Sequence, residues 1–306
     1  MIDLSGRNLV CTQWLAENLG LAENLGLTEN LGLAENLDAP DILVLDGSWH
    51  LPGDHRDPRA EYLTQHIATA RFFDIDAISD ASSPLPHMLP SPAEFAQHMA
   101  KLGLGDNTAI VVYDASWQGL FSAARVWWML RVFGHENVAV LDGGLKKWTA
   151  EGRLTTADVA SHSSSAVFTP RLNASLVRNL ADMRSLLTTQ SAQIADARGA
   201  GRFAGTEPEP RPGLRSGHMP GARNVPFTTL LNPDGTMRPA AELRDVFERA
   251  GIDVAKPVVT SCGSGVTAAV VSLALAAVGQ PNNGLYDGSW SEWGQAFLDT
   301  EIATTA

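Results

Sequence analysis

Cysteine is scarce in this sequence of 306 residues, which contains only Cys11 and Cys262. Two thiols are too few for a disulfide framework or for a metal site built from thiolates. The scarcity fits a reducing compartment, in which a catalytic thiol stays free. The N-terminus also lacks a basic region followed by an apolar core, so we expect a cytoplasmic protein.

Basic residues are in deficit too, with 22 Lys and Arg against 34 Asp and Glu, a net charge of −12. A surface of this sign repels nucleic acid and anionic lipid, so we expect neither as a partner. No apolar run reaches the length of a membrane span, so we expect no association with a membrane. We also expect a monomer. An anionic substrate would need a local arginine cluster to overcome the overall field.

Cofactor motifs are absent as well. The sequence has no Cys-x-x-Cys, no His-Glu-x-x-His and no phosphate-binding loop. We therefore expect neither a metal nor an organic cofactor.

Short apolar runs alternate with longer periodic stretches along the chain. The runs at 42–45, 109–113, 138–141 and 257–260 are typical of buried strands, and the stretches at 120–132, 241–250 and 266–278 of helices. This alternation predicts an α/β fold with parallel sheets flanked by helices.

The two halves of the chain resemble each other. Segments 46–49, 65–76, 112–116 and 141–148 have counterparts, in the same order, at 196–198, 217–227, 259–265 and 285–293. We infer a duplicated domain, with an N-terminal copy at 1–152, a linker at 153–169 and a C-terminal copy at 170–306. The linker is rich in Ser, Thr and Ala, which suits a connecting segment.

A hexapeptide, Leu-Ala-Glu-Asn-Leu-Gly with small variations, repeats four times at 15–38. Six residues advance about 600° along an α-helix, so the leucines spiral around it and form no single face. We interpret the array as an expansion of a surface segment that carries no chemistry.

The segment Val-Val-Thr-Ser-Cys-Gly-Ser-Gly-Val-Thr-Ala-Ala at 258–269 carries the most chemical information. A buried strand leads into Cys262, followed by a loop with two glycines and an apolar helix. Glycines let successive backbone N–H groups turn inward, and the helix N-terminus favours negative charge. This setting stabilises a thiolate. The same loop is expected to cradle a sulfur atom attached to the thiol through the N–H groups of Gly263, Gly265, Val266 and Thr267.

Cys262 also admits other interpretations. A lone cysteine is most often a buried structural residue, but ligands bind beyond the carboxyl ends of parallel strands, where this one lies. A phosphatase of the Cys-x5-Arg type needs an arginine six residues after the cysteine. This chain has Ala268 at that position, which excludes the type. A protease-type dyad needs an imidazole in reach, and the sequence does not exclude His87 or His218 on geometry. Nothing around Cys262 matches a protease signature, however.

Several motifs resemble the two-domain rhodanese-like sulfurtransferases, and within them the branch that uses 3-mercaptopyruvate. These motifs are Cys-Gly-Ser-Gly-Val-Thr at 262–267, Gly-Arg-Phe-Ala-Gly-Thr-Glu-Pro-Glu-Pro-Arg at 201–211, Ser-Gly-His-Met-Pro-Gly-Ala at 216–222, Phe-Phe-Asp-Ile-Asp at 72–76 and Pro-His-Met-Leu-Pro at 86–90. The resemblance covers nearly the whole chain except the array and the linker. It implies tandem rhodanese domains, the first of them inactive. Asp114 and Ala115 stand where that copy would need a cysteine.

The resemblance also implies a donor and an acceptor. Thiosulfate-preferring relatives carry basic residues after the cysteine, whereas Gly263 and Ser264 are neutral. The implied donor is 3-mercaptopyruvate, with release of pyruvate, and the implied acceptor is thioredoxin, another thiol or cyanide. The alternatives are a thiosulfate:cyanide sulfurtransferase and a non-catalytic persulfide carrier.

By the same resemblance, Arg202 and Arg211 clamp the substrate carboxylate, a role that suits the planar guanidinium. Either arginine could instead pair with a nearby acid, for which the candidates are Glu207, Glu209 and Asp196.

A relay of Ser264, His87 and Asp76 is implied as well, and it would serve the enolate that departs. His87 could equally be an ordinary loop histidine, and Asp76 a turn or cap residue. We interpret His218 as structural, because its ring N–H can tie down a carbonyl near a tight turn.

Overall fold

The computed structural model describes residues 2–21, 42–159 and 166–305. The chain divides into two compact units. The first comprises Met1–Ile78, Ser91–Leu172 and Pro233–Thr236, and the second comprises Ser79–Pro90, Asn173–Asn232 and Met237–Ala306. The expected domain limits at 152 and 170 stay predictions. Most of the hexapeptide array falls outside the described residues, so its interpretation stays a prediction too.

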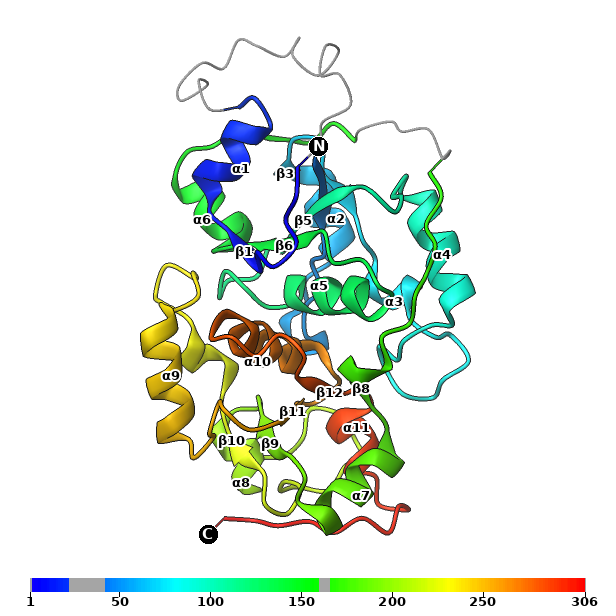
Figure 1. The fold of residues 1–306 in the computed structure, drawn as a ribbon, viewed down its shortest axis with the longest axis vertical. Helices are drawn as coiled ribbons and strands as arrows, with labels where there is room; N and C mark the ends of the chain where they lie inside the picture. Colours follow the sequence, from blue (N-terminus) through cyan, green and yellow to red (C-terminus); the bar gives the residue numbers. More distant parts are fainter. Residues whose placement is uncertain (1, 22–41, 160–165, 306) are drawn as a thin grey trace. The chain divides into compact units, whose positions relative to one another are not determined.

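The first unit contains a parallel sheet in the strand order β1-β6-β5-β2-β4 (Figure 1). Its strands are β1 (Leu9–Val10), β2 (Ile42–Asp46), β4 (Arg71–Phe72), β5 (Ala109–Tyr113) and β6 (Val138–Leu141), and a separate antiparallel pair joins β3 (His66–Ile67) to β7 (Thr155–Thr156). Every residue of β2, β5 and β6 is buried. Burial on both faces explains why these strands are continuously apolar rather than alternating.

The helices of the first unit are α1 (Thr12–Asn18), α2 (Pro58–Thr64), α3 (Ile75–Ile78), α4 (Pro92–Lys101), α5 (Ala123–Val132) and α6 (Gly144–Ala150). Helix α4 begins where its sequence dictates, because Ser91 and Glu94 form a reciprocal capping box and Pro92 occupies the first turn. Helix α5 begins at Ala123, later than the predicted 120. The N–H groups of Phe121 and Ala123 donate to the Asp114 carboxylate instead of entering a helix at that point.

The second unit contains a parallel sheet in the order β10-β9-β11-β12-β8. Its strands are β8 (Val177–Arg178), β9 (Gln193–Asp196), β10 (Arg223–Asn224), β11 (Val258–Ser261) and β12 (Gly284–Tyr286), and its helices are α7 (Leu180–Thr189), α8 (Ala200–Ala204), α9 (Ala240–Arg249), α10 (Val266–Ala277) and α11 (Ser289–Trp293). Helix α10 is apolar and buried around almost its whole circumference, as expected for a core helix. The predicted helices at 241–250 and 266–278 are confirmed to within one residue.

The two sheets confirm the duplication. In chain order, β1, β2, β4, β5 and β6 correspond to β8, β9, β10, β11 and β12, and the strand orders of the sheets then coincide. The registers agree as well, because Asp46 lies opposite Tyr113 in one sheet and Asp196 opposite Ser261 in the other. The residue after Tyr113 therefore corresponds to the residue after Ser261.

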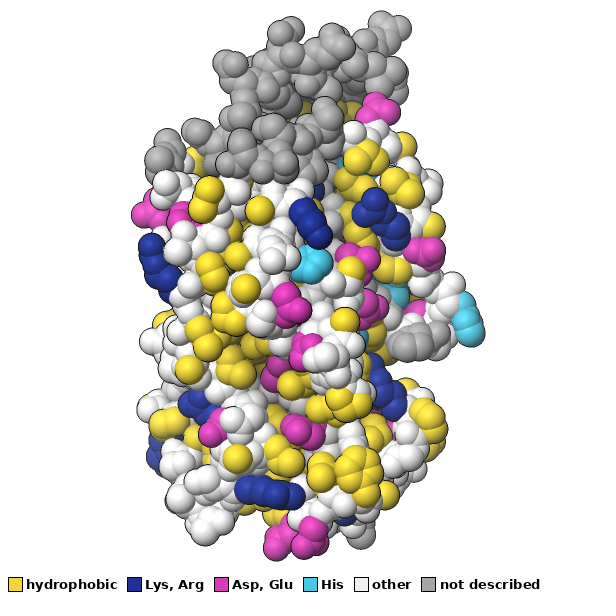
Figure 2. Space-filling model, turned by 90° about the vertical axis from the view of Figure 1, so that its right-hand side faces the viewer, with side chains coloured by type: hydrophobic (Ala, Val, Ile, Leu, Met, Phe, Trp, Pro, Cys, Tyr) yellow, Lys and Arg dark blue, Asp and Glu magenta, His cyan; other side chains and the backbone are white. Residues whose placement is uncertain are grey.

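On the face shown in Figure 2, acidic and basic side chains are interspersed rather than gathered by sign. Within 2–21, 42–159 and 166–305, no helix combines the length and the apolar character needed to cross a membrane.

Candidate active site

Cys262 lies between the end of β11 and the start of α10, as predicted. Its side chain is buried, with 2% of the residue exposed, and it forms no disulfide. Gly265 adopts a left-handed conformation (φ 78°) immediately before α10. Glycine is suited to this conformation, and it allows the loop to turn directly into the helix. Val266 and Thr267 form the first turn of α10, where N–H groups are left without helical partners.

The backbone around Cys262 is held by the start of α11. The Cys262 carbonyl accepts a hydrogen bond from the N–H of Trp290 at 3.0 Å, and the Gly263 carbonyl accepts one from the N–H of Ser291 at 2.8 Å. The Cys262 N–H donates to Oγ of Ser289 at 3.2 Å. The cysteine is therefore carried by a loop whose peptide groups are fixed on both sides.

Arg202 of α8 lies against this loop. A Cβ atom placed on Gly263 would stand 3.0 Å from its Nη2 atom, so the glycine leaves room for the guanidinium. The same Nη2 donates to Oε2 of Glu209 at 2.5 Å. The alternative pairing considered for Arg202 is thus present. Arg202 makes this ion pair and also lies beside the cysteine loop.

Glu209 also holds a second arginine that the sequence did not single out. Arg198 donates to Oε1 of Glu209 at 2.7 Å and to both carboxylate oxygens of Asp196, and its guanidinium lies 4.1 Å from the ring centre of Trp290. Both Arg198 and Glu209 have almost fully buried side chains. Burial opposes the charge on Arg198, but Asp196 and Glu209 outweigh it and raise the pKa of the guanidinium.

The segment 79–90 brings His87 to the cysteine loop. His87 is buried, has a left-handed backbone (φ 61°) and donates from Nδ1 to the carbonyl oxygen of Ser264 at 3.2 Å. The N–H of Leu89 donates to Oδ2 of Asp287 at 2.9 Å and anchors the same segment. The structure therefore joins two members of the expected relay, through the backbone of Ser264 rather than its hydroxyl.

The remaining predicted residues differ in their placement. Arg211 is partly buried in the loop that follows α8. Asp76 belongs to α3 in the first unit, where its Oδ2 accepts a hydrogen bond from Nε1 of Trp49 at 3.1 Å. His218 is stacked on Phe203 and donates from Nδ1 to the Phe203 carbonyl at 2.8 Å, which confirms its structural interpretation.

The first unit places Asp114 at the position that corresponds to Cys262. The carboxylate is buried and accepts hydrogen bonds from the N–H groups of Ser116, Phe121 and Ala123 at 2.8–2.9 Å. Burial raises the pKa of this carboxyl group. The amides that follow the strand are thus occupied by a fixed side chain, and the site offers no nucleophilic thiol.

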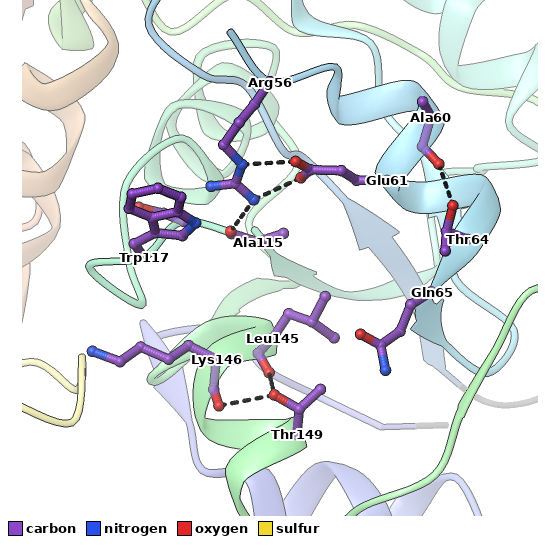
Figure 3. Close-up of a pocket in the computed structure, with 11 residues that line it drawn as sticks. Arg56, Ala60, Glu61, Thr64, Gln65, Ala115, Trp117, Leu145, Lys146 and Thr149 are labelled. Atoms are coloured by element: carbon purple, nitrogen blue, oxygen red, sulfur yellow. Dashed lines mark hydrogen bonds and ion pairs between the residues drawn. The ribbon is translucent and has the colours of Figure 1, made fainter. Parts of the chain in front are cut away.

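An open groove of ≈ 640 Å³ lies beside this loop in the first unit, flanked by Ala115, Trp117 and Lys146 (Figure 3). Arg56 and Lys146 both line this groove. Both Glu61 carboxylate oxygens and the Ala115 carbonyl already accept the hydrogen bonds of Arg56, and the Pro233 carbonyl accepts one from Nζ of Lys146. An anionic substrate would compete there with a resident carboxylate. The residues that line this groove include neither a thiol nor an arginine without a carboxylate partner.

Within the described parts of the chain, no group of three or more His, Cys, Asp and Glu side chains is arranged to hold a metal ion.

Comparisons with known proteins identify the family. The model of the rhodanese-like domain matches residues 30–151 and 179–296. The chain is 43% identical over 287 residues to human 3-mercaptopyruvate sulfurtransferase, and 42% identical over 288 residues to bovine thiosulfate sulfurtransferase, covering 94% of this chain and 92% of the relative in each case.

Solved structures give the same result. The crystal structure of SseA from Escherichia coli, described as a 3-mercaptopyruvate sulfotransferase with the rhodanese fold, superimposes with a TM-score of 0.77 at 41% identity, covering 93% of this chain and 99% of that one. Tum1 from Saccharomyces cerevisiae gives a TM-score of 0.81 at 31% identity, covering 97% and 98%.

Proposed function

Because this chain belongs to the rhodanese-like family, we propose that it is a sulfurtransferase that moves sulfur from 3-mercaptopyruvate to a thiol through a persulfide on Cys262. The observation that carries the proposal is the cysteine loop itself, a buried thiol beside neutral residues with an arginine against Gly263. The first unit serves as an inactive copy, because Asp114 occupies the nucleophile position.

In the first step the Cys262 thiolate attacks the sulfur of 3-mercaptopyruvate. A sulfur–sulfur bond forms as the carbon–sulfur bond breaks, and the electron pair of that bond leaves with carbon as the enolate of pyruvate. The thiol proton of the donor moves to the enolate carbon. Pyruvate departs, and Cys262 holds a deprotonated persulfide whose terminal sulfur is stabilised by the N–H groups of Gly263, Gly265, Val266 and Thr267.

The carboxylate of the donor is bound by Arg202 and Arg211 in this proposal. A guanidinium can hold a carboxylate by two parallel hydrogen bonds, and such a clamp places the donor sulfur beside the thiolate. Nη2 of Arg202 already donates one hydrogen bond to Glu209, so the substrate carboxylate has the guanidinium edge formed by the remaining N–H groups. The carboxylate of Glu209 then sets the orientation in which Arg202 presents that edge.

His87 and Ser264, with Asp76, are proposed to assist the enolate. The supporting observation is the hydrogen bond from Nδ1 of His87 to the Ser264 backbone, two residues after the nucleophile. A group held at this point can stabilise developing charge or guide the proton. The contribution of Asp76 rests on the family resemblance.

In the second step an acceptor thiolate attacks the outer sulfur of the persulfide. The bond to Cys262 breaks, the cysteine leaves as a thiolate, and the acceptor carries the sulfur away. Thioredoxin is the proposed acceptor, and cyanide can replace it in an assay to give thiocyanate.

Thiosulfate is the rival donor, since thiosulfate sulfurtransferases are as similar to the chain as the mercaptopyruvate enzymes. Overall identity therefore does not choose between the donors. The loop favours mercaptopyruvate, because Gly263 and Ser264 offer no cation for a small dianion. A non-catalytic persulfide carrier is the second rival, and only an assay of turnover separates it from an enzyme.

The deciding experiment measures pyruvate release from 3-mercaptopyruvate and thiocyanate formation from thiosulfate and cyanide. It compares the wild type with Cys262→Ser and, as the matched control, Cys11→Ser. We expect a higher kcat/KM for mercaptopyruvate, complete loss in Cys262→Ser and no loss in Cys11→Ser. A higher kcat/KM for thiosulfate would overturn the donor assignment, and no turnover of either donor would favour the carrier.

We further propose a cytoplasmic monomer, on the cysteine count and the net charge of −12. One relative is described as mitochondrial, so localisation is best tested directly by fractionation, and the oligomeric state by light scattering.

A further inference from the structure

Ser289 adopts a backbone conformation that is unfavourable for serine. It has φ 47°, in the left-handed region, and none of its surface is exposed. A residue with a Cβ atom rarely takes this conformation, and glycine is the residue that takes it without strain.

The first unit shows the same turn without the strain. Gly144 corresponds to Ser289 in the duplicated sequence, and it has φ 56°. The backbone hydrogen bonds correspond as well, since Leu145 donates to the Asp114 carbonyl at 3.0 Å and Trp290 donates to the Cys262 carbonyl at 3.0 Å. The turn can therefore be built on glycine, and the unit with the cysteine uses serine instead.

The serine hydroxyl makes two hydrogen bonds that a glycine cannot make. Oγ of Ser289 accepts the N–H of Cys262 at 3.2 Å and donates to the carbonyl of Tyr286 at 2.8 Å. The hydroxyl thus joins the end of β12 to the peptide group that precedes the nucleophile. Fixing that N–H fixes the direction in which the Cα–Cβ bond of Cys262 leaves the backbone.

We infer that Ser289 is a positioning residue for Cys262, retained in a strained conformation because its hydroxyl orients the nucleophile. Strained backbone persists where the surroundings hold it, and it gathers at functional sites. The inference deepens the proposed function, because it concerns the same cysteine, but it does not depend on which donor supplies the sulfur.

The test uses two variants on a Cys11→Ser background, so that Cys262 is the only thiol. Ser289→Gly removes the hydroxyl and relieves the backbone strain, whereas Ser289→Ala removes the hydroxyl and keeps the strain. The matched control is Ser272→Ala, which removes another buried hydroxyl of the second unit, bonded to Oγ of Thr260 at 2.8 Å. Each protein is measured for Tm, for alkylation of Cys262 by iodoacetamide at pH 7, and for kcat and KM.

We expect alkylation and kcat to fall about fivefold in both Ser289 variants, the effect of one net hydrogen bond, with KM within about twofold of wild type. The Tm of Ser289→Gly should equal or exceed that of the wild type, whereas the Tm of Ser289→Ala should fall. Ser272→Ala should lose Tm and keep its alkylation rate. Loss of reactivity without loss of stability is the signature that a purely structural serine would not give.

Unchanged alkylation and kcat in Ser289→Gly would overturn the inference, and so would failure of that variant to fold. The outcome is separable from the proposed function. If the wild type does not turn over mercaptopyruvate but Ser289→Gly still slows alkylation, the donor assignment fails and the role of Ser289 stands.

Discussion

Nη2 of Arg202 lies 2.5 Å from Oε2 of Glu209, and the other oxygen of the same carboxylate accepts from Arg198 at 2.7 Å. One buried carboxylate therefore binds two arginines that have different surroundings. Arg198 is enclosed between Asp196 and Trp290, whereas Arg202 reaches the cysteine loop.

Glu209→Gln tests this shared carboxylate. Glutamine keeps one acceptor oxygen and turns an NH₂ group toward the other arginine, so it loosens Arg202 and leaves Arg198 poorly paired. We expect KM for mercaptopyruvate to rise about tenfold and the free energy of unfolding to fall by about 3 kcal/mol, in line with broken buried ion pairs. Steady-state kinetics and urea unfolding measure the two effects.

Glu207→Gln is the control, because Glu207 is exposed in the same loop and should change neither quantity. A lower KM in Glu209→Gln would mean that Glu209 competes with the substrate for Arg202, which contradicts the orienting role.

Gly263→Ala tests the approach of Arg202 to the loop. The new Cβ would stand 3.0 Å from Nη2 of Arg202, and the end of a long side chain yields more easily than a backbone does. We expect KM to rise at least about threefold while stability changes by less than about 0.5 kcal/mol. Gly199→Ala serves as the control, since a Cβ there meets nothing within 4 Å. Unchanged kinetics in Gly263→Ala would remove Arg202 from the substrate site.

Asp46→Asn tests a pH dependence in the first unit. Burial raises the pKa of Asp46 to about 6, against the bonds from Ser48 and Tyr113 that lower it. The folded state therefore holds a proton that the unfolded state releases near pH 4. Between these values, stability falls as pH rises, and roughly 3 kcal/mol present at pH 4 is lost above pH 6.

Asparagine cannot release that proton. The stability of Asp46→Asn relative to wild type should therefore increase from pH 4 to pH 7, as measured by urea unfolding at each pH. Asp106→Asn should show no comparable rise over this range, because hydrogen bonds from Thr169 lower the pKa of Asp106, so its stabilisation is present above about pH 4 and is lost only as pH falls below that value. A flat difference curve for Asp46→Asn would refute the assignment.

Asp114→Asn tests whether the first unit is inactive but structurally important. The two oxygens of Asp114 accept three N–H groups, and an amide must turn its NH₂ toward one or two of them. We expect a loss of about 1–3 kcal/mol in unfolding free energy, with kcat/KM unchanged below the unfolding transition. A loss of turnover in the folded variant would show that the first unit takes part in the chemistry.

The fold was largely predictable from sequence, because buried parallel strands and a core helix carry continuous apolar runs. The start of α5 was not, since residues 120–122 are apolar or neutral and read as helical. The Asp114 carboxylate takes the N–H of Phe121, and that tertiary bond delays the helix. The pattern of apolar residues does not reveal that the Asp114 carboxylate, seven residues earlier, accepts the N–H of Phe121.

The position of Cys262 between a buried strand and an apolar helix was predictable from the sequence, whereas the roles given to Cys262 and Arg202 stay predictions. Arg198 and Ser289 were missed. Arg198 is one of several arginines near acidic residues, and only burial against Trp290 distinguishes it. Ser289 is distinguished by its φ angle, although a signal was present in the duplicated sequence, where glycine corresponds to serine.

The segment 79–90 belongs to the second unit while its sequence neighbours on both sides belong to the first. His87 and Leu89 are bonded within that second unit, so a fragment that begins after residue 170 would lack both. The duplicated halves are therefore no longer interchangeable modules. Exchange of residues 170–306 alone would separate the Cys262 loop from His87, so the two halves can no longer be exchanged without loss of this contact.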